Sequence, residues 1–286
     1  MKPKESKIYG QRACRAVFAR RPDDVLRVLL TDALVPSFGQ ELKACAQARR
    51  PYRVVPADEL ERITASRHHE GICVVTRPRQ VRDPAQVLAA PGPAVILALA
   101  DVRNPHNVGA LLRTAAHFGA RAALLSGASS LSAASHRTAE GAAEWLELMF
   151  SDPLDRGLAL CLDHGFTICA TSSHEGESLY ERPLPDRLVV LLGGERDGLP
   201  RRLMQQAGRR LRIPGTGHVE SLNVSAASAV ILAESWREHA SDSIATRSQK
   251  NQTRKPGSRK SSQKNQKGKT TPARSGGKPR SKNTAG

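Results

Sequence analysis

The sequence predicts an α/β protein with two folded parts and a basic tail, and three observations support this. Short apolar runs alternate with helical patterns over the first 240 residues, as they do where helices cover a largely parallel sheet. Four prolines interrupt this pattern within residues 77–93 and indicate a linker. From residue 241 the apolar pattern stops and Lys and Arg become frequent.

Residues 1–77 have the pattern of a small α/β unit. Its helices are expected near residues 10–20, 37–49 and 57–66, and its strands at 25–30, 52–55 and 71–75. A linker at 78–93 leads to a second unit at 94–240, with strands expected at 94–100, 122–126, about 145–149, 166–171, 188–193 and 210–213. Ligands of such sheets bind beyond the carboxyl ends of the strands.

Composition narrows the class of protein. The chain has 286 residues, of which 39% are hydrophobic, enough to build a core. No apolar run approaches the roughly 20 residues that span a bilayer, and the amino end lacks a signal-peptide hydrophobic region, so we expect a cytoplasmic protein without a membrane partner. Its five cysteines form no CxxC pair, which predicts neither a disulfide framework nor a metal site.

The net charge of +17 is concentrated in the tail. Residues 241–286 hold 13 Lys and Arg against Asp242, or +12, which leaves 31 − 26 = +5 for residues 1–240. The tail has no Phe, Trp, Tyr, Leu, Met or Cys, so it is predicted to be disordered. Its cations favour binding to nucleic acid, through salt-dependent contacts with phosphates, over a role as a solubilising appendage.

Three segments with polar side chains follow predicted strands. In residues 99–120, Asn107 is expected to cap a helix, and Arg113 lies six residues later, either as a solvated surface residue or as a charge directed at a phosphate. In residues 189–200, Gly193 and Gly194 end a strand and Glu195 is a lone carboxylate there. Glu195 could pair with a neighbouring arginine or order loops around a cationic ligand.

The third segment, residues 213–234, runs from a strand end through a glycine-containing loop into an Ala- and Val-rich helix. Gly215 and Gly217 permit close approach of the backbone to a ligand, and Ser221 and Asn223 carry oxygens suited to capping the helix. The fingerprints GxGxxG and GxxxxGK[ST] are absent from the second segment, which argues against dinucleotide and P-loop nucleotide sites.

In this order, NPHNVGALLRTAA, GGERDGL and IPGTGHVESLNVSAASA resemble the three motifs of the SpoU (TrmH) family in the SPOUT superfamily, whose members are tRNA and rRNA 2′-O-ribose methyltransferases. The resemblance covers about residues 94–238. It extends more weakly over 8–77, where IYGQRACRAVF and HHEGICVV resemble the family's small substrate-binding domain.

The resemblance implies a SPOUT-type parallel sheet with a carboxyl-terminal trefoil knot, S-adenosylmethionine as cofactor, RNA as partner and a homodimer. Position by position, it implies main-chain contacts to the cofactor from Gly193, Ile213 and Leu222, supported by Gly194, Glu195, Pro214, Ser221 and Asn223. The implied polar catalytic set is Asn107, Arg113, Glu195 and Asn223.

The implied reaction is transfer of a methyl group to a ribose 2′-hydroxyl of rRNA or tRNA. Because a guanidinium is normally too basic to lose its proton, we hypothesise that Arg113 orients the ribose and a phosphate and stabilises charge on the oxygen. Two alternatives stay open: a catalytically idle relative that binds RNA during ribosome assembly, and an α/β enzyme with another cofactor.

Overall fold

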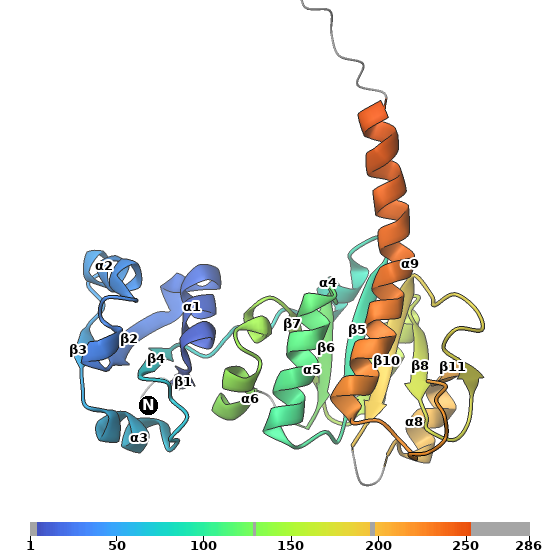
Figure 1. Cartoon of the computed structure of the whole chain (residues 1–286), viewed down its shortest axis with the longest axis horizontal. Helices are drawn as coiled ribbons and strands as arrows, with labels where there is room; N and C mark the ends of the chain where they lie inside the picture. The colour runs from blue at the N-terminus through green and yellow to red at the C-terminus, as the bar shows by residue number, and fades with distance from the viewer. Residues whose placement is uncertain (1–4, 128–129, 195–197, 253–286) are drawn as a thin grey trace, which may run out of the picture. The chain divides into compact units, whose positions relative to one another are not determined.

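The computed structural model describes residues 5–127, 130–194 and 198–252, with side chains through residue 239 (Figure 1). Two β-sheets organise these residues. The elements around the first sheet are β1 (Ser6–Tyr9), α1 (Gln11–Arg20), η1 (Pro22–Asp24), β2 (Val25–Leu30), η2 (Asp32–Leu34), α2 (Gly39–Gln47), β3 (Tyr52–Val54), α3 (Ala57–Thr64) and β4 (Ile72–Thr76).

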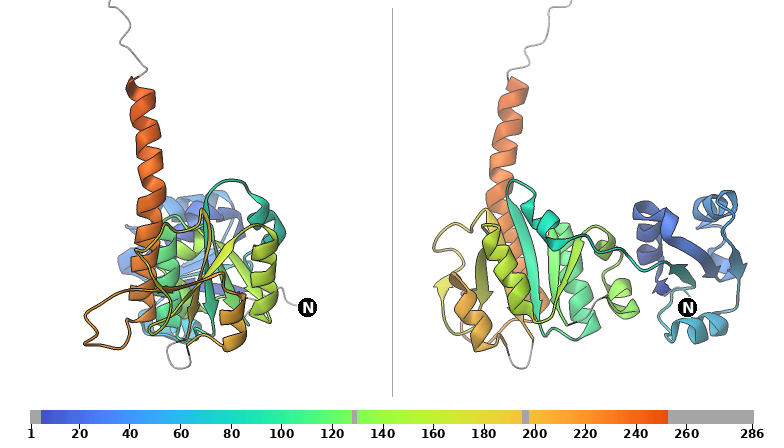
Figure 2. Two further views of the ribbon diagram at one scale, coloured as in Figure 1. Left: turned by 90° about the vertical axis from the view of Figure 1, so that its right-hand side faces the viewer. Right: turned by 180° about the vertical axis from the view of Figure 1, so that it is seen from behind.

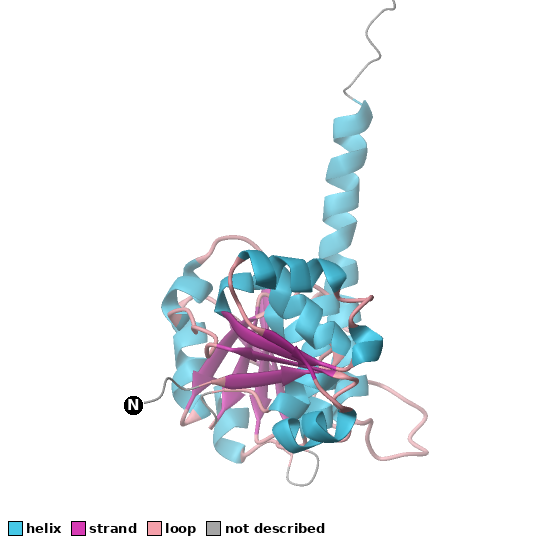
Figure 3. Ribbon diagram, turned by 90° about the vertical axis from the view of Figure 1, so that its left-hand side faces the viewer, coloured by secondary structure: helices cyan, strands magenta, loops and turns pink. Residues whose placement is uncertain are grey.

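The first sheet has the strand order β1-β4-β2-β3. Strand β4 pairs antiparallel with β1 and β2, and β2 pairs parallel with β3. Helices α1 and α2 pack on one face through Val17 and Leu42, and α3 packs on the other through Leu60 (Figure 3). All five residues of β4 are buried, which explains its unbroken apolar sequence. The predicted helices and strands of this region are confirmed, and the short β1 was not predicted.

The second sheet is larger and its paired strands all run parallel. Its strand order is β7-β6-β5-β10-β8-β11-β9. The elements are α4 (Pro84–Ala89), β5 (Ala94–Ala100), α5 (Pro105–His117), β6 (Ala122–Ser126), α6 (Ala133–Thr138), η3 (Ala142–Glu144), β7 (Glu147–Ser151), α7 (Leu154–Asp163), β8 (Thr167–Thr171), β9 (Glu177–Ser178), β10 (Arg187–Gly193), α8 (Arg201–Gln206), β11 (Arg209–Arg212) and α9 (Val224–Gln252).

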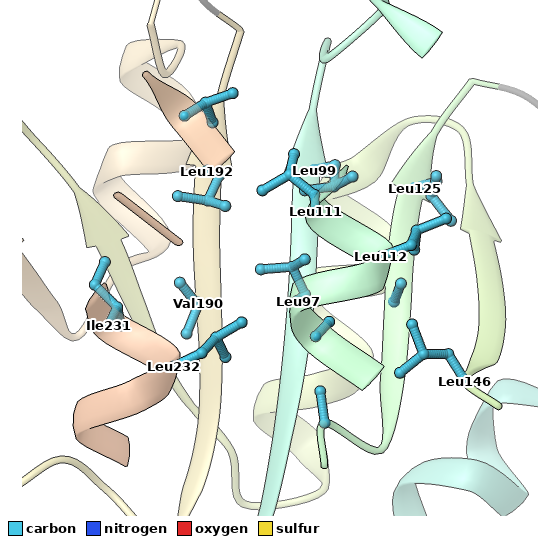
Figure 4. Close-up of a cluster of buried hydrophobic side chains, with 14 of the residues drawn as sticks. Leu97, Leu99, Leu111, Leu112, Leu125, Leu146, Val190, Leu192, Ile231 and Leu232 are labelled. Carbon is cyan, nitrogen blue, oxygen red and sulfur yellow. The ribbon is translucent and has the colours of Figure 1, made fainter. Parts of the chain in front are cut away.

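Helices cover both faces of this sheet, as the alternating pattern predicts (Figure 2). On one face, α5 and α9 pack against the strands through Leu111, Leu112, Ile231 and Leu232 (Figure 4). On the other face, α4, α7 and α8 contribute buried side chains that include Leu158. With both faces covered, the strands are almost wholly apolar, as expected for a buried parallel sheet.

The structure corrects three predictions. The linker at 78–93 contains helix α4, whose Val87 and Leu88 are buried. Strand β7 begins at Glu147, two residues after the expected start. The tail predicted to be disordered from residue 241 is helical through Gln252, because no Gly or Pro interrupts the chain between Val224 and Pro256 and a helix propagates once begun. The remainder of the predicted tail lies outside the described residues.

Candidate functional site

The three glycine- and polar-rich segments meet at one edge of the seven-stranded sheet. They follow β5, β10 and β11, whose carboxyl ends lie at the same edge because the sheet is parallel. Gly193, the last residue of β10, is in register with Ala100, the last residue of β5. The strand order reverses between these two strands, which is where open α/β sheets form ligand crevices.

The first segment begins with helix α5. The side chain of Asn104 caps this helix by accepting a hydrogen bond of 3.0 Å from the backbone N–H of His106. The prediction that Asn107 is the cap is therefore wrong. Pro105 occupies the first helical position, where its fixed φ fits, so the helix begins three residues earlier than expected and Asn107 lies in its first turn.

Arg113 lies two turns into α5, and 55% of its side chain is exposed. Its Nη1 is 3.1 Å from Oε1 of Glu140, a residue just after α6. The other oxygen of Glu140 accepts a hydrogen bond of 2.5 Å from Nη1 of Arg12 in α1. Arg113 is thus both exposed and ion-paired. Glu140 and Arg12 were not singled out in the sequence, since 128 residues separate them and no motif connects them.

The second segment closes tightly on itself. A Cβ on Gly193 would lie 2.5 Å from the carbonyl oxygen of Gly198, and one on Gly194 would lie 2.9 Å from the carbonyl oxygen of Asp101. Gly194 and Gly198 also form an isolated antiparallel bridge. Glycine is therefore required at both positions for steric reasons. Glu195, predicted to belong to the site, lies outside the described residues.

The third segment gives an open loop, residues 213–223, which we call the strand-end loop. Ile213 is half-buried at its start, whereas residues 214–223 are exposed. Leu222 is 48% exposed and Val219 is 72% exposed, although both are apolar. The loop ends where Oδ1 of Asn223 accepts a hydrogen bond of 2.9 Å from the N–H of Ser225 and caps α9. The predicted capping role of Asn223 is confirmed, and Ser221 lies two residues earlier in the exposed loop.

A cavity of about 470 Å³ opens beyond the carboxyl ends of β5, β6 and β7. This volume is within the range of small-molecule sites. Its polar lining includes Asp101, Arg103, Ser126, Ser132, Asp152 and Arg202. In the part of the chain that the structure describes, no group of three or more His, Cys, Asp or Glu side chains is arranged to hold a metal ion.

A cluster of charged side chains lies just before the amino end of β7. Glu144 at the end of η3 is 4% exposed and receives two hydrogen bonds from Arg21, at 2.9 and 3.0 Å. Arg79 is 4.0 Å from Glu144, and its guanidinium donates to the carbonyl oxygens of Ala143 and Leu146. With His136, which is close enough to Glu144 for their charges to interact, these residues form what we call the junction cluster: Arg21, Arg79, His136 and Glu144.

Contacts within the junction cluster and its burial determine the protonation states of Glu144 and His136. Burial alone would raise the pKa of Glu144, but the hydrogen bonds and charge of Arg21 outweigh burial and keep this pKa below its ordinary value. Burial lowers the pKa of His136 to about 4, so its imidazole is neutral at pH 7. The ionised Glu144 is therefore paired within the cluster, which supports a structural role for these residues.

Comparison with known proteins agrees with the motifs. Residues 94–233 match the SpoU rRNA Methylase family, and residues 7–82 match the family described as RNA 2′-O ribose methyltransferase substrate binding. A relative in Escherichia coli O157:H7, named "Uncharacterized tRNA/rRNA methyltransferase YfiF", is 35% identical over 82% of this chain and 69% of its own length. The chain belongs to the SpoU rRNA methylase family.

Solved structures with the SpoU fold superpose on most of the chain. One, titled as an RNA 2′-O ribose methyltransferase, has a TM-score of 0.69 and 24% identity, and covers 82% of this chain and 89% of its own. Another, titled as an AdoMet-bound rRNA methyltransferase from Sinorhizobium meliloti, has a TM-score of 0.67 and 20% identity, with coverages of 82% and 87%. These likenesses establish the α/β fold with a parallel sheet that the sequence predicts. Within the described residues, no helix is long and apolar enough to cross a membrane.

Proposed function

We propose that this protein is an S-adenosylmethionine-dependent RNA methyltransferase that methylates a ribose 2′-hydroxyl of rRNA or tRNA. The observation that carries the proposal is the meeting of all three SpoU motif segments at one sheet edge, where the strand order reverses. The names of the relative and of the solved structures, which refer to RNA methylation and in one case to bound AdoMet, support it.

The cofactor would be held by the strand ends and the strand-end loop. The backbone at Gly193 and Gly194 approaches its neighbours too closely to carry side chains, so these glycines fix the path of the chain at the end of β10. The exposed Leu222 supplies apolar surface for an adenine or ribose to cover. The proposed contacts come from Gly193, Ile213 and Leu222, with Gly194, Glu195, Pro214, Ser221 and Asn223 in support.

When bound, S-adenosylmethionine would supply a methyl group already activated on its sulfonium, which the ribose 2′-oxygen would accept as it loses its proton, with S-adenosylhomocysteine as the leaving group. Arg113 has an exposed guanidinium, which can bind a phosphate and the developing oxyanion through paired N–H donors. The proton leaves to a phosphate or to water. Asn107, Glu195 and Asn223 complete the proposed polar set.

The carboxyl-terminal chain would form the trefoil knot of the family, and two copies would associate. Trp236, on α9, is 53% exposed and leaves apolar area for a second copy to bury. We place the protein in the cytoplasm. Residues 1–77 would form the domain that selects the RNA, with residues 94–240 as the catalytic domain.

The basic tail would add affinity for RNA phosphates without choosing the methylated nucleotide. Residues 253–286 hold 11 Lys and Arg and no Asp or Glu. Removing them leaves helix α9 intact, so a chain truncated after Gln252 isolates the charge effect. We expect weaker RNA binding with a shallower salt dependence and an unchanged methylation site. A shifted methylation site would show that the tail also selects the nucleotide.

The first experiment measures transfer of labelled methyl from S-adenosylmethionine to undermethylated bulk RNA, followed by nucleoside analysis. Wild-type protein should place label in a 2′-O-methylated nucleoside, and Arg113→Ala should lose this activity. If both bind RNA and cofactor but neither transfers label to free RNA or to ribosome-assembly particles, the alternative of a catalytically idle RNA-binding protein replaces the proposal.

A second variant tests how Arg113 acts. Lysine keeps the positive charge but lacks the planar pair of donors. If orientation through two N–H groups matters, Arg113→Lys should lower the single-turnover rate at every pH between 6 and 9. A near-normal rate in this variant would mean that a point charge is sufficient.

A further inference from the structure

Glu140 contacts two arginines from distant parts of the chain. One carboxylate oxygen is 3.1 Å from Nη1 of Arg113 in α5, and the other is 2.5 Å from Nη1 of Arg12 in α1. The side chains of Arg12 and Arg113 are 71% and 55% exposed, whereas that of Glu140 is 35% exposed. The carboxylate therefore links two guanidinium groups that both remain open to an incoming anion.

The backbone around Glu140 is fixed by close packing toward α1. Glu140 itself has a φ of 49°, a left-handed conformation that is rare for residues other than glycine. The next residue, Gly141, has a φ of 89°, and a Cβ there would lie 2.6 Å from Cβ of Ala16 and 3.0 Å from the carbonyl oxygen of Arg12. This turn is pressed against α1, so Glu140 is presented from a rigid position.

The same segment is equally close to α5. A Cβ on Gly109 would lie 2.5 Å from Cβ of Thr138 and 2.8 Å from the backbone nitrogen of Ala139. Gly109 precedes Arg113 by one turn of α5. Helix α1, the turn at Glu140 and helix α5 thus form a continuous packed path, and their relative positions leave little freedom to the carboxylate.

We propose that Glu140 is a positioning residue for Arg113 and that Arg12 connects it to RNA held by the amino-terminal part of the chain. The ion pair limits the rotamers of Arg113, so the guanidinium is already oriented when the ribose arrives. Arg12 holds the second carboxylate oxygen, so the carboxylate keeps its orientation toward Arg113 while RNA phosphates approach the two guanidinium groups. This inference rests on the proposed methyltransferase function.

A purely structural role for Glu140 predicts a different outcome. Exposed ion pairs stabilise a fold only weakly, so loss of this carboxylate should leave unfolding almost unchanged. Removing one negative charge beside two arginines should also leave RNA affinity equal to or greater than that of wild type. A lower rate of methyl transfer with undiminished RNA affinity therefore separates positioning from structural support.

The test uses the full chain under single-turnover conditions with saturating S-adenosylmethionine and RNA. Glu140→Gln, which keeps the size of the side chain, should lower the rate about tenfold or more. The matched control is Glu70→Gln, because Glu70 pairs with Arg137 at 3.5 Å, also between residues far apart in the chain, without contacting Arg113. The control should keep a rate within about twofold of wild type.

Arg12→Ala provides an independent measurement. In the wild-type background it should lower the rate several-fold, and in the Glu140→Gln background it should lower it no further. The inference is overturned if Glu140→Gln has the wild-type rate or if Glu70→Gln lowers the rate as much as Glu140→Gln does. It is also overturned if the rate decreases caused by Arg12→Ala and Glu140→Gln multiply in the double variant. A wild-type protein that methylates no RNA overturns the proposed function, and with it this inference, whereas an active wild type tests the inference alone.

Discussion

The junction cluster and the strand-end loop both belong to one fold, but they differ in their contacts. The charged groups of the junction cluster are buried against one another, whereas the residues of the strand-end loop face solvent. In the junction cluster, Glu144 is 4% exposed and is held by two hydrogen bonds from Arg21. In the strand-end loop, residues 215–223 are exposed, and Leu222 and Val219 turn apolar surface to solvent.

The difference separates stability from binding. Where buried charged groups are paired with one another, removal of one partner strongly lowers the free energy of unfolding. Exposed apolar side chains beside a glycine-rich strand end cost little to alter in the free protein, and they are available to a ligand or a second copy. Substitutions in the two regions should therefore have opposite profiles: loss of stability in one, loss of ligand binding in the other.

The largest expected effect is on stability, from Arg21→Ala. This change leaves the Glu144 carboxylate buried without its bidentate partner, so we expect a loss of about 3–5 kcal/mol in the free energy of unfolding. Urea denaturation measures it. Arg62→Ala is the matched control, because its pair with Asp58 is exposed and should contribute at most about 1 kcal/mol. Equal losses in the two variants would contradict the expectation that the buried cluster contributes more to stability than an exposed ion pair.

Acid should weaken the junction cluster next. The unfolded chain protonates His136 near pH 6.5, whereas the folded chain does so only near pH 4, so protons favour unfolding as the pH falls between these values. The lowered pKa of Glu144 acts in the same direction: its contribution is complete above its ordinary pKa and disappears as the pH falls through the folded value.

We therefore expect the free energy of unfolding to fall from pH 7 to pH 4, with His136 contributing at most about 3 kcal/mol. Chemical denaturation across this pH range measures it. His136→Gln should flatten the part of the curve between pH 6.5 and 4. An unchanged curve in that variant would exclude His136 as the titrating group.

Gly193→Ala should affect both the fold and the binding edge of the sheet. The new methyl group would meet the carbonyl oxygen of Gly198 at 2.5 Å, so we expect a displaced strand end and a loss of about 1–3 kcal/mol in stability. Binding of S-adenosylmethionine, measured by calorimetry, should weaken about tenfold or more. In Gly39→Ala the added methyl group meets no atom within 4 Å, so that variant should bind normally.

The smallest expected effect comes from Asn223→Ala. Its side chain caps α9, and loss of such a cap costs about 1 kcal/mol. Thermal unfolding should show this modest decrease. The free energy of S-adenosylmethionine binding should decrease by more than the free energy of unfolding. If stability falls by as much as in Arg21→Ala, the strand-end loop is as integral to the fold as the junction cluster.

The sequence predicts the framework well because periodicity reports burial. Strands 94–100 and 122–126 coincide with β5 and β6, since both are apolar on two faces and bounded by turns. The residue that caps α5 was harder to predict. Asn104 and Asn107 lie on either side of Pro105, and both could cap a helix, so only the backbone shows where α5 begins.

Contacts between distant residues were not predictable from patterns in a single chain. Glu140 looks like an ordinary polar residue before a glycine, and its pairing with Arg12 and Arg113 follows from how α1, α5 and α6 pack. The helix through Gln252 was also missed, because composition describes the tail as a whole and not the helix that enters it. The proposed roles of the site residues stay predictions.

The position of β10 in the middle of the large sheet has a consequence for how the chain must fold during synthesis. β5, β6 and β7 are made first and can pair with one another, but the inner edge of β5 has no partner until residues 187–193 have left the ribosome. The starts of β5 and β10 are 187 − 94 = 93 residues apart, a long-range pairing of the kind that folds slowly. Until then β5 presents a bare apolar edge, so we expect chains released before residue 187 to aggregate and to depend on chaperones for solubility.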